Sequence, residues 1–232
     1  MKTLKQITGL LVLSLFFACA PAVNSAYQSS IDNQLTNVQP ANKSYDHGPK
    51  AELAVGQWVR YKSLDKNGSP SIHTTQIIGT EGGLYWVQLD LESYYHKVSY
   101  QMLMHAPTTA ADLNVVRVLE KREQAIQYRE LSPFEMSVFK RMQGIGLGTL
   151  SWHAITAPGQ ETVQSQAGTF NGCKTKHQSM SVFGMHVESQ STIHNAVPFS
   201  GTVRSTNKRD PRQTTELLAF GYQGLASFAQ SY

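Results

Sequence analysis

The chain has 232 residues, of which 41% are hydrophobic, so it is long enough for one domain with an ordinary core and a tail. The chain has 20 basic and 16 acidic residues. If residues 1–26 are removed as the signal described below, Lys2 and Lys5 are lost and the net charge falls to +2. This even balance excludes the strongly basic class of nucleic-acid-binding proteins.

Residues 1–26 have the three-part pattern of a secretory signal. Lys2 and Lys5 precede an apolar run over residues 9–18, and small residues follow that run. The run is shorter than the ~20 residues needed to cross a bilayer, and no later segment of the sequence is apolar over that length. The sequence therefore predicts an exported protein.

Two processing sites compete in this signal. Residues 15–19, Leu-Phe-Phe-Ala-Cys, resemble the lipobox of bacterial lipoproteins, which implies a signal over residues 1–18 and acylation of Cys19. The alternative is ordinary cleavage after Ala22 or Ala26. The polar residues 27–53 favour the lipoprotein, because a flexible tether follows a lipid anchor. The predicted location is the periplasm or the outer membrane of a Gram-negative bacterium. For the lipoprotein, Ala20 after the cysteine implies the outer membrane, with the anchor as the membrane contact.

From residue 54 the chain changes to short apolar runs separated by turn signals, which predicts a single β-rich domain over residues 54–232. Asn67-Gly68 is a strong hairpin signal between the runs at residues 58–62 and 72–79. Period-two alternation over residues 84–91 and 98–104 extends this into an antiparallel meander with one buried face. Further strands are expected at residues 114–119, 125–128, 162–166, 168–177, 181–190, 201–205 and 214–222.

One helix stands out after this meander. Ser132 as N-cap, Pro133 at the first helical position and Glu135 at the third form a capping box. Gly144 is expected to end the helix, and the glycines that follow it predict either a flexible connection or a hinge. The predicted apolar face consists of Phe134, Val138 and Met142, with Phe139 beside it. About ten strands and one clear helix define a mainly β (α+β) fold.

Cys173, His177 and Met180 have the residue types of a copper site. On a strand, however, Cys173 and His177 lie roughly 13 Å apart, which is too far for one metal ion. We therefore predict that Cys173 is a small buried apolar residue, that no metal or cofactor is bound, and that a copper or thiol redox protein is the less favoured interpretation. No nucleophile elbow or zinc-protease helix occurs, so the sequence predicts a non-enzymatic protein.

Four short motifs resemble those of a family of uncharacterised bacterial envelope proteins. They are Gly-x-Trp-Val-x-Tyr at residues 56–61, Ala-Gly-Thr-Phe with a following Cys at 167–173, Ala-Val-Pro-x-Ser-Gly at 196–201 and Leu-Leu-x-Phe-Gly at 217–221. Such proteins look like relatives of the LolA and LolB lipoprotein carriers. The resemblance implies a strongly curved antiparallel sheet, or half-barrel, with one or two helices against it and an apolar cavity beneath a helix.

The leading functional hypothesis is an envelope protein that binds a lipid or another apolar ligand between the sheet and the capped helix. Soft methionine and phenylalanine side chains accommodate acyl chains of different shapes. The alternative is a structural or protein-interaction lipoprotein whose cavity is filled by its own side chains. The residues predicted to contact the ligand are Met102, Met104, Phe134, Met136, Phe139 and Met142.

Overall fold

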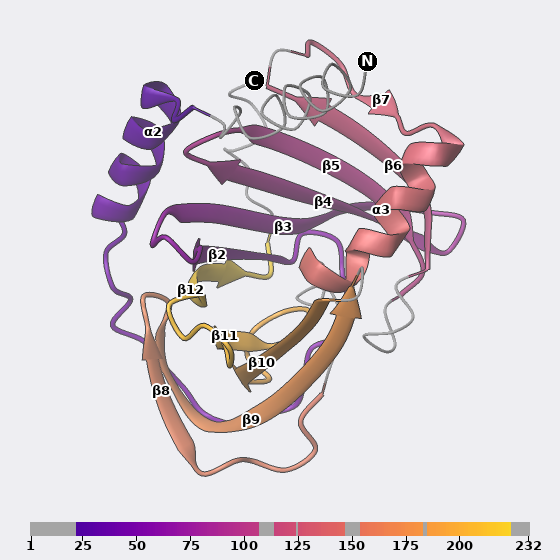
Figure 1. The fold of residues 1–232 in the computed structure, drawn as a ribbon. Coiled ribbons are helices and arrows are strands. Elements are labelled where there is room, and N and C mark those ends of the chain that lie inside the picture. Colours follow the sequence, from indigo (N-terminus) through magenta and orange to yellow (C-terminus); the bar gives the residue numbers. More distant parts are fainter. Residues whose placement is uncertain (1–21, 107–113, 124, 147–153, 183–184, 224–232) are drawn as a thin grey trace, which may run out of the picture.

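The structure is a computed structural model that describes residues 22–106, 114–123, 125–146, 154–182 and 185–223. It confirms the mainly β prediction, because a curved, unclosed mixed sheet of twelve strands carries two helices (Figure 1). The helices are α2 (Ser25–Thr36) and α3 (Pro133–Gly146). The strands are β1 (Ser44–Tyr45), β2 (Trp58–Leu64), β3 (Pro70–Glu81), β4 (Leu84–Ser93), β5 (Lys97–Met104), β6 (Val115–Arg122), β7 (Arg129–Glu130), β8 (Glu161–Ser165), β9 (Gly168–Val182), β10 (Met185–Ile193), β11 (Thr202–Asn207) and β12 (Thr214–Gly221).

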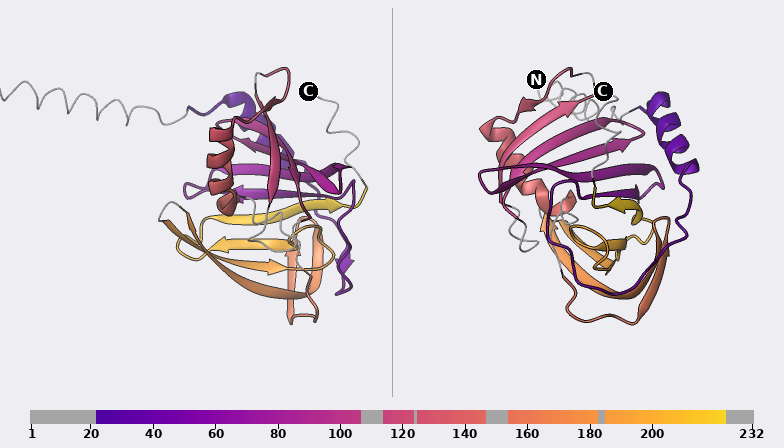
Figure 2. Two further views of the ribbon diagram at one scale, coloured as in Figure 1. Left: turned by 90° about the vertical axis from the view of Figure 1, so that its right-hand side faces the viewer. Right: turned by 180° about the vertical axis from the view of Figure 1, so that it is seen from behind.

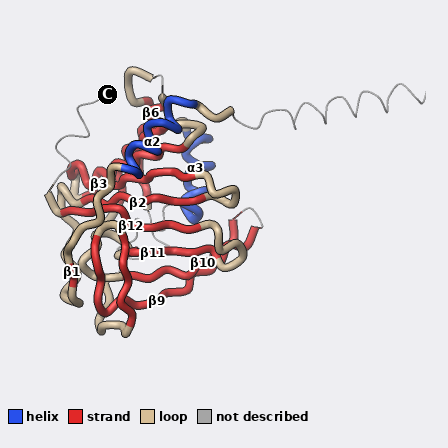
Figure 3. Tube along the Cα trace, turned by 90° about the vertical axis from the view of Figure 1, so that its left-hand side faces the viewer, coloured by secondary structure: helices blue, strands red, loops and turns tan. Residues whose placement is uncertain are grey.

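The strands follow one another in the order β1-β9-β10-β11-β12-β2-β3-β4-β5-β6-β7, and β8 pairs with β9 off this path. Figure 3 shows the succession from β9 through β12, β2 and β3 to β6. All neighbours are antiparallel except β1 and β9. The last strand, β12, pairs with the first long one, β2, and so joins the two halves of the chain into one sheet.

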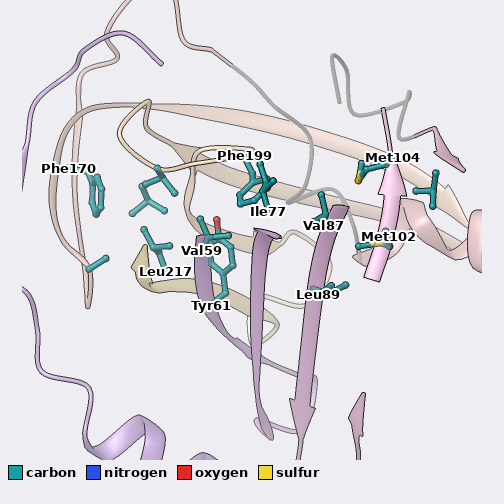
Figure 4. Close-up of a cluster of buried hydrophobic side chains, with 14 of the residues drawn as sticks. Val59, Tyr61, Ile77, Val87, Leu89, Met102, Met104, Phe170, Phe199 and Leu217 are labelled. Carbon is teal, nitrogen blue, oxygen red and sulfur yellow. The ribbon is translucent and has the colours of Figure 1, made fainter. Parts of the chain in front are cut away.

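Side chains alternate between two faces along these strands, as the sequence pattern predicts. On β2, Val59 and Tyr61 are buried, while Trp58 and Arg60, which alternate with them, are half-buried on the opposite face. We call the face that carries Val59 and Tyr61 the inner face and the opposite one the outer face. The inner face holds one continuous hydrophobic core, part of which Figure 4 shows.

The four motifs of the sequence analysis meet in this core. Its fully buried members include residues of all four, namely Val59, Tyr61, Ala167, Phe170, Cys173, Val197, Phe199 and Leu217. The Tyr61 hydroxyl donates a hydrogen bond of 3.1 Å to the carbonyl oxygen of Thr202. A Cβ atom on Gly221 would lie 2.5 Å from the Trp58 indole nitrogen, so the last motif packs tightly on the first. The motifs therefore specify the packing of the core.

Several element boundaries differ from the sequence predictions. Residues 125–128 form a turn instead of a strand, with the Ala125 amide bonded to the carbonyl of Arg122, and the edge strand is β7. Ile126 is exposed there and has no core to face. Strand β9 continues to Val182 rather than ending at residue 177, since β10 pairs with it from Lys174 to Val182. Helix α3 continues past Gly144 to Gly146.

Residues 27–53, predicted as a flexible tether, instead contain α2 and β1, and both pack against the sheet. Asn24 caps α2 by accepting a hydrogen bond of 3.0 Å from the amide of Ala26. Ile31 is fully buried, and Ser30 and Gln34 donate hydrogen bonds of 2.8 and 3.1 Å to the Glu92 carboxylate on the outer face of β4. The polar composition of this segment therefore reflects a polar packing surface.

The segment after β1 also lies against the domain. Lys50 is largely buried, and its ammonium group donates a hydrogen bond to the carbonyl oxygen of Val197 in the Ala-Val-Pro loop. Burial away from water lowers the pKa of Lys50 to about 7. The charged form is therefore disfavoured in the folded protein.

We predict that Ile31→Ala lowers the free energy of unfolding by about 2–5 kcal/mol, because the substitution opens a cavity under α2. The control is Val23→Ala just before the helix, where the side chain is half exposed and the expected change is within about 0.5 kcal/mol. Urea unfolding measures both. Equal, small effects would mean that residues 25–36 do not belong to the folded domain.

A second prediction concerns pH. The pKa of Lys50 is about 7 in the folded protein and 10.5 when unperturbed, so the unfolded chain binds more protons between these values and stability rises with pH there. Relative to Lys50→Met, the wild-type protein should gain about 1–2 kcal/mol of unfolding free energy between pH 7 and 8.5. Parallel urea titrations of the two proteins measure this difference, and a constant gap between them would contradict the burial of a titrating lysine.

Candidate functional site

Helix α3 covers part of the inner face of the sheet. Figures 1 and 2 show it running from β7 toward the end of β9. Met136 and Phe139 are half-buried and pack against the core. The rings of Phe139 and Tyr100 on β5 lie 5.4 Å apart between centroids, tilted by 50°. Met136 and Phe139, three residues apart, form the described contact between α3 and the core.

The N-terminus of α3 has the predicted capping box. The Glu135 amide donates to the Ser132 hydroxyl at 3.3 Å, and the Ser132 amide and hydroxyl donate to the Glu135 carboxylate at 2.9 and 2.8 Å. These reciprocal bonds satisfy amides that the first helical turn leaves without a helical partner. The start of the helix is thus determined by local sequence.

A buried carboxylate connects this helix start to the sheet. Glu120 on β6 is only 4% exposed, and it accepts hydrogen bonds from Tyr100 at 3.3 Å and from Arg129. Arg129 also donates to Glu135 at 2.9 and 3.1 Å, and Arg122 forms a second ion pair with Glu120 at 3.2 Å. Arg129 thus connects β7 to Glu120 on β6 and to Glu135 on α3. Loss of Arg129 would weaken the pairing of the buried Glu120 carboxylate, which is strongly destabilising.

The protonation states agree with this network. Hydrogen bonds from Arg129, and then from Ser132, lower the pKa of Glu135 to about 2. Burial, followed by the nearby charge of Glu120, raises the pKa of Tyr100. Glu135 therefore stays ionised, and Tyr100 stays a hydrogen-bond donor, over the whole neutral range.

The structure brings together four of the residues predicted to contact a ligand. Met102 and Met104 on β5 are fully buried in the inner core, where Figure 4 labels them, and Met136 and Phe139 lie above on α3. The side chain of Met142 and the acylation candidate Cys19 lie outside the described residues. The inner face of β4–β6 and the contacting face of α3 form the candidate site.

The structure places Phe134 apart from these four residues. Its side chain is 77% exposed, because the face of α3 toward the sheet is that of Met136 and Phe139. Two residues along a helix correspond to a rotation of about 200°, so Phe134 points away from Met136. Of the predicted apolar face, Phe134 is exposed and Val138 is half-buried.

Cys173 is buried, as predicted. Strand β9 runs unbroken through it, and its thiol hydrogen donates weakly to the carbonyl of Phe170 at 3.4 Å. Burial raises the pKa of Cys173 to about 11, so the group is a thiol at neutral pH. His177 is exposed, and the described side chains include no cluster of three His, Cys, Asp or Glu able to hold a metal ion. Cys173 and His177 thus do not converge.

Two features of the site were missed in the sequence. Glu120 was assigned to a charged turn, although its even spacing from buried Val118 on β6 could have indicated an inward position. A hollow on the outer face of β4–β6 was also missed; its polar residues on β4 and β5, Gln88, Asp90, Ser99 and Gln101, alternate with core residues of the same strands.

Searches for similar proteins gave no match to any family model, curated protein or solved structure. Within the described part of the chain, none of the helices is long and apolar enough to cross a membrane.

The ion pair between Arg129 and Glu135 at the start of α3 should weaken in acid. The pKa of Glu135 is about 2, against an ordinary value of 4.5, so its stabilising contribution is complete above pH 4.5 and disappears as the pH falls through about 2. We expect amide hydrogen exchange in the first turn of α3 to accelerate over that window. Glu135→Gln keeps a capping side chain but not the charge, so it should exchange faster at neutral pH and respond less to acid. Superimposable pH profiles of the two proteins would contradict the role of the ion pair.

Proposed function

We propose that this protein binds a lipid or another apolar ligand without catalysing a reaction, between α3 and the inner face of β4–β6. The observation that supports this most is how α3 is attached. Polar contacts of Arg129, Glu120 and Glu135 hold its N-terminal end, while Met136 and Phe139 make its described contacts with the core. Such a helix can act as a lid, because its polar end stays attached while its apolar contacts with the core can be exchanged for contacts with a ligand.

The surface beneath α3 has the chemistry for such a ligand. Met102 and Met104 on β5 and Val118 on β6 are buried there, and the aromatic ring of Tyr100 lies beside them. An acyl chain gains about 0.8 kcal/mol for each CH₂ group removed from water, so displacement of two side chains of the lid is readily offset. Methionine side chains adjust to chains of different length.

The resemblance to LolA- and LolB-like envelope proteins implies a fold that suits this function, and the signal pattern of residues 1–26 supports an exported location. Of the processing sites, the lipobox at Cys19 and cleavage after Ala22 both keep Asn24, which caps α2 in the structure. Cleavage after Ala26 would remove this cap and the first two residues of a helix that packs on the sheet. We therefore propose a mature chain that begins at Cys19, with an acyl anchor, or just after Ala22.

A structural or protein-interaction module is the second candidate. It is favoured by the full burial of Met102 and Met104, since side chains of the protein itself then occupy the inner face. Native mass spectrometry of protein extracted gently from membranes separates the two: a bound lipid supports the carrier. A consistently empty protein that also fails to take up a fluorescent fatty acid supports the module.

We predict that Phe139→Ala speeds the uptake of a fluorescent fatty acid about two- to tenfold, because opening the lid must break the Phe139–Tyr100 contact, worth about 0.5–1.5 kcal/mol. The matched control is Phe134→Ala, on the same helix but exposed, which should leave the rate unchanged. Stopped-flow fluorescence measures both rates. Equal effects of the two variants, or none, would argue against α3 as the lid.

A further inference from the structure

A hollow of about 260 Å³ lies on the outer face of β4, β5 and β6. Its lining residues Gln88 and Asp90 on β4 and Ser99 and Gln101 on β5 alternate with core residues of those strands, so these four side chains lie across the sheet from the site under α3. The volume is near the lower end for ligand pockets, which suits one small ring-sized molecule. The lining residues are Gln88, Asp90, Lys97, Val98, Ser99, Gln101, Lys121, Arg122, Glu123 and Tyr128.

Three of these side chains, Gln101, Gln88 and Asp90, form a chain of hydrogen bonds that we call the relay. The Gln101 amide nitrogen donates to the Gln88 amide oxygen at 3.3 Å, and the Gln88 nitrogen donates to the Asp90 carboxylate at 2.9 Å. Each group fixes the orientation of the next. Among the described residues, the amide oxygen of Gln101 and the second carboxylate oxygen of Asp90 have no hydrogen-bond donor. The two ends of the relay therefore present acceptors that suit hydroxyl groups.

The other side of the hollow presents donors. The hydroxyl groups of Ser99 and Tyr128 are hydrogen-bonded at 2.7 Å, and the Lys121 ammonium group lies 5.9 Å from the centre of the Tyr128 ring. Tyr128 comes from the turn before β7, so it forms a wall beside the three strands. The hollow therefore has hydrogen-bond acceptors on its floor and donors at its wall. A hydroxyl group can pair with both, because it is both a donor and an acceptor.

The charges of the hollow favour an uncharged ligand. Lys97 is paired with Glu92 at 3.6 Å and Arg122 with Glu120 at 3.2 Å. The carboxylates of Asp90 and Glu123 also line the hollow, so it carries no excess positive charge for a phosphate or another strong anion. Ammonium groups among the lining residues equally oppose a bare metal cation.

From this lining we propose that the outer-face hollow binds a saccharide unit. The hydroxyl groups of one sugar ring donate hydrogen bonds to Asp90 and Gln101. They accept hydrogen bonds from Lys121 and from the hydroxyl pair of Ser99 and Tyr128. The inference does not depend on the apolar ligand proposed under α3, because the two sites use different faces and different side chains.

Nuclear magnetic resonance titration of the ¹⁵N-labelled protein tests the proposal, with glucose and N-acetylglucosamine as probes. We expect saturable shifts of the Gln88 and Gln101 side-chain amides, with a dissociation constant on the order of 1 mM for at least one of the sugars. Inorganic phosphate and glycine are the competing probes. The proposal is overturned when neither sugar shifts these amides, or when phosphate or glycine saturates them instead.

Two variants and one control locate the binding. Gln101→Met and Asp90→Asn should each weaken sugar binding at least tenfold, since each removes an acceptor at one end of the relay. The control is Gln76→Met, because Gln76 pairs with Gln88 in register on the same face but does not line the hollow. Far-ultraviolet circular dichroism checks that each variant is folded, and either folded variant suffices for the comparison. Undiminished sugar binding by a folded variant would overturn the assignment.

Discussion

The antiparallel pairing of β12 with β2 is the interaction on which the rest of the structure depends. It places Leu217 opposite Tyr61 and Phe220 opposite Val59, so residues far apart in the chain complete one inner face. Without this pairing, the meander of β2–β7 and the group β8–β12 would each expose an apolar surface to water. With it, the sheet curves around a single core, and the Tyr61 hydroxyl finds its acceptor on Thr202.

The elements that the sequence predicted well are those specified by neighbouring residues. The hairpin at Asn67-Gly68 and the capping box of Ser132 and Glu135 need only local contacts, and both occur as expected. Helix α2 was missed because its polar side chains are satisfied by distant partners such as Glu92. The two-residue strands β1 and β7 are likewise too short to leave a pattern and exist through pairing with β9 and β6.

The candidate site shows the same division. Period-two alternation placed Met102 and Met104 correctly on the inner face of β5, because strand geometry fixes which side chains share a face. It could not orient α3, where Phe134 and Met136 are both apolar and only tertiary packing selects the second. The same alternation on β6 is consistent with an inward Glu120, but it does not indicate the pairing with Arg129, which comes from another strand.

One sheet thus offers two chemically different surfaces, an apolar one beneath α3 and a polar hollow on β4–β6, and the function that we propose uses the first. It is tested most directly by methyl nuclear magnetic resonance of the methionine-labelled protein with a spin-labelled fatty acid. We expect the Met102, Met104 and Met136 methyl signals to broaden selectively, since these side chains adjoin the proposed acyl chain. Unchanged signals for all three, or broadening confined to other methionines, would contradict it.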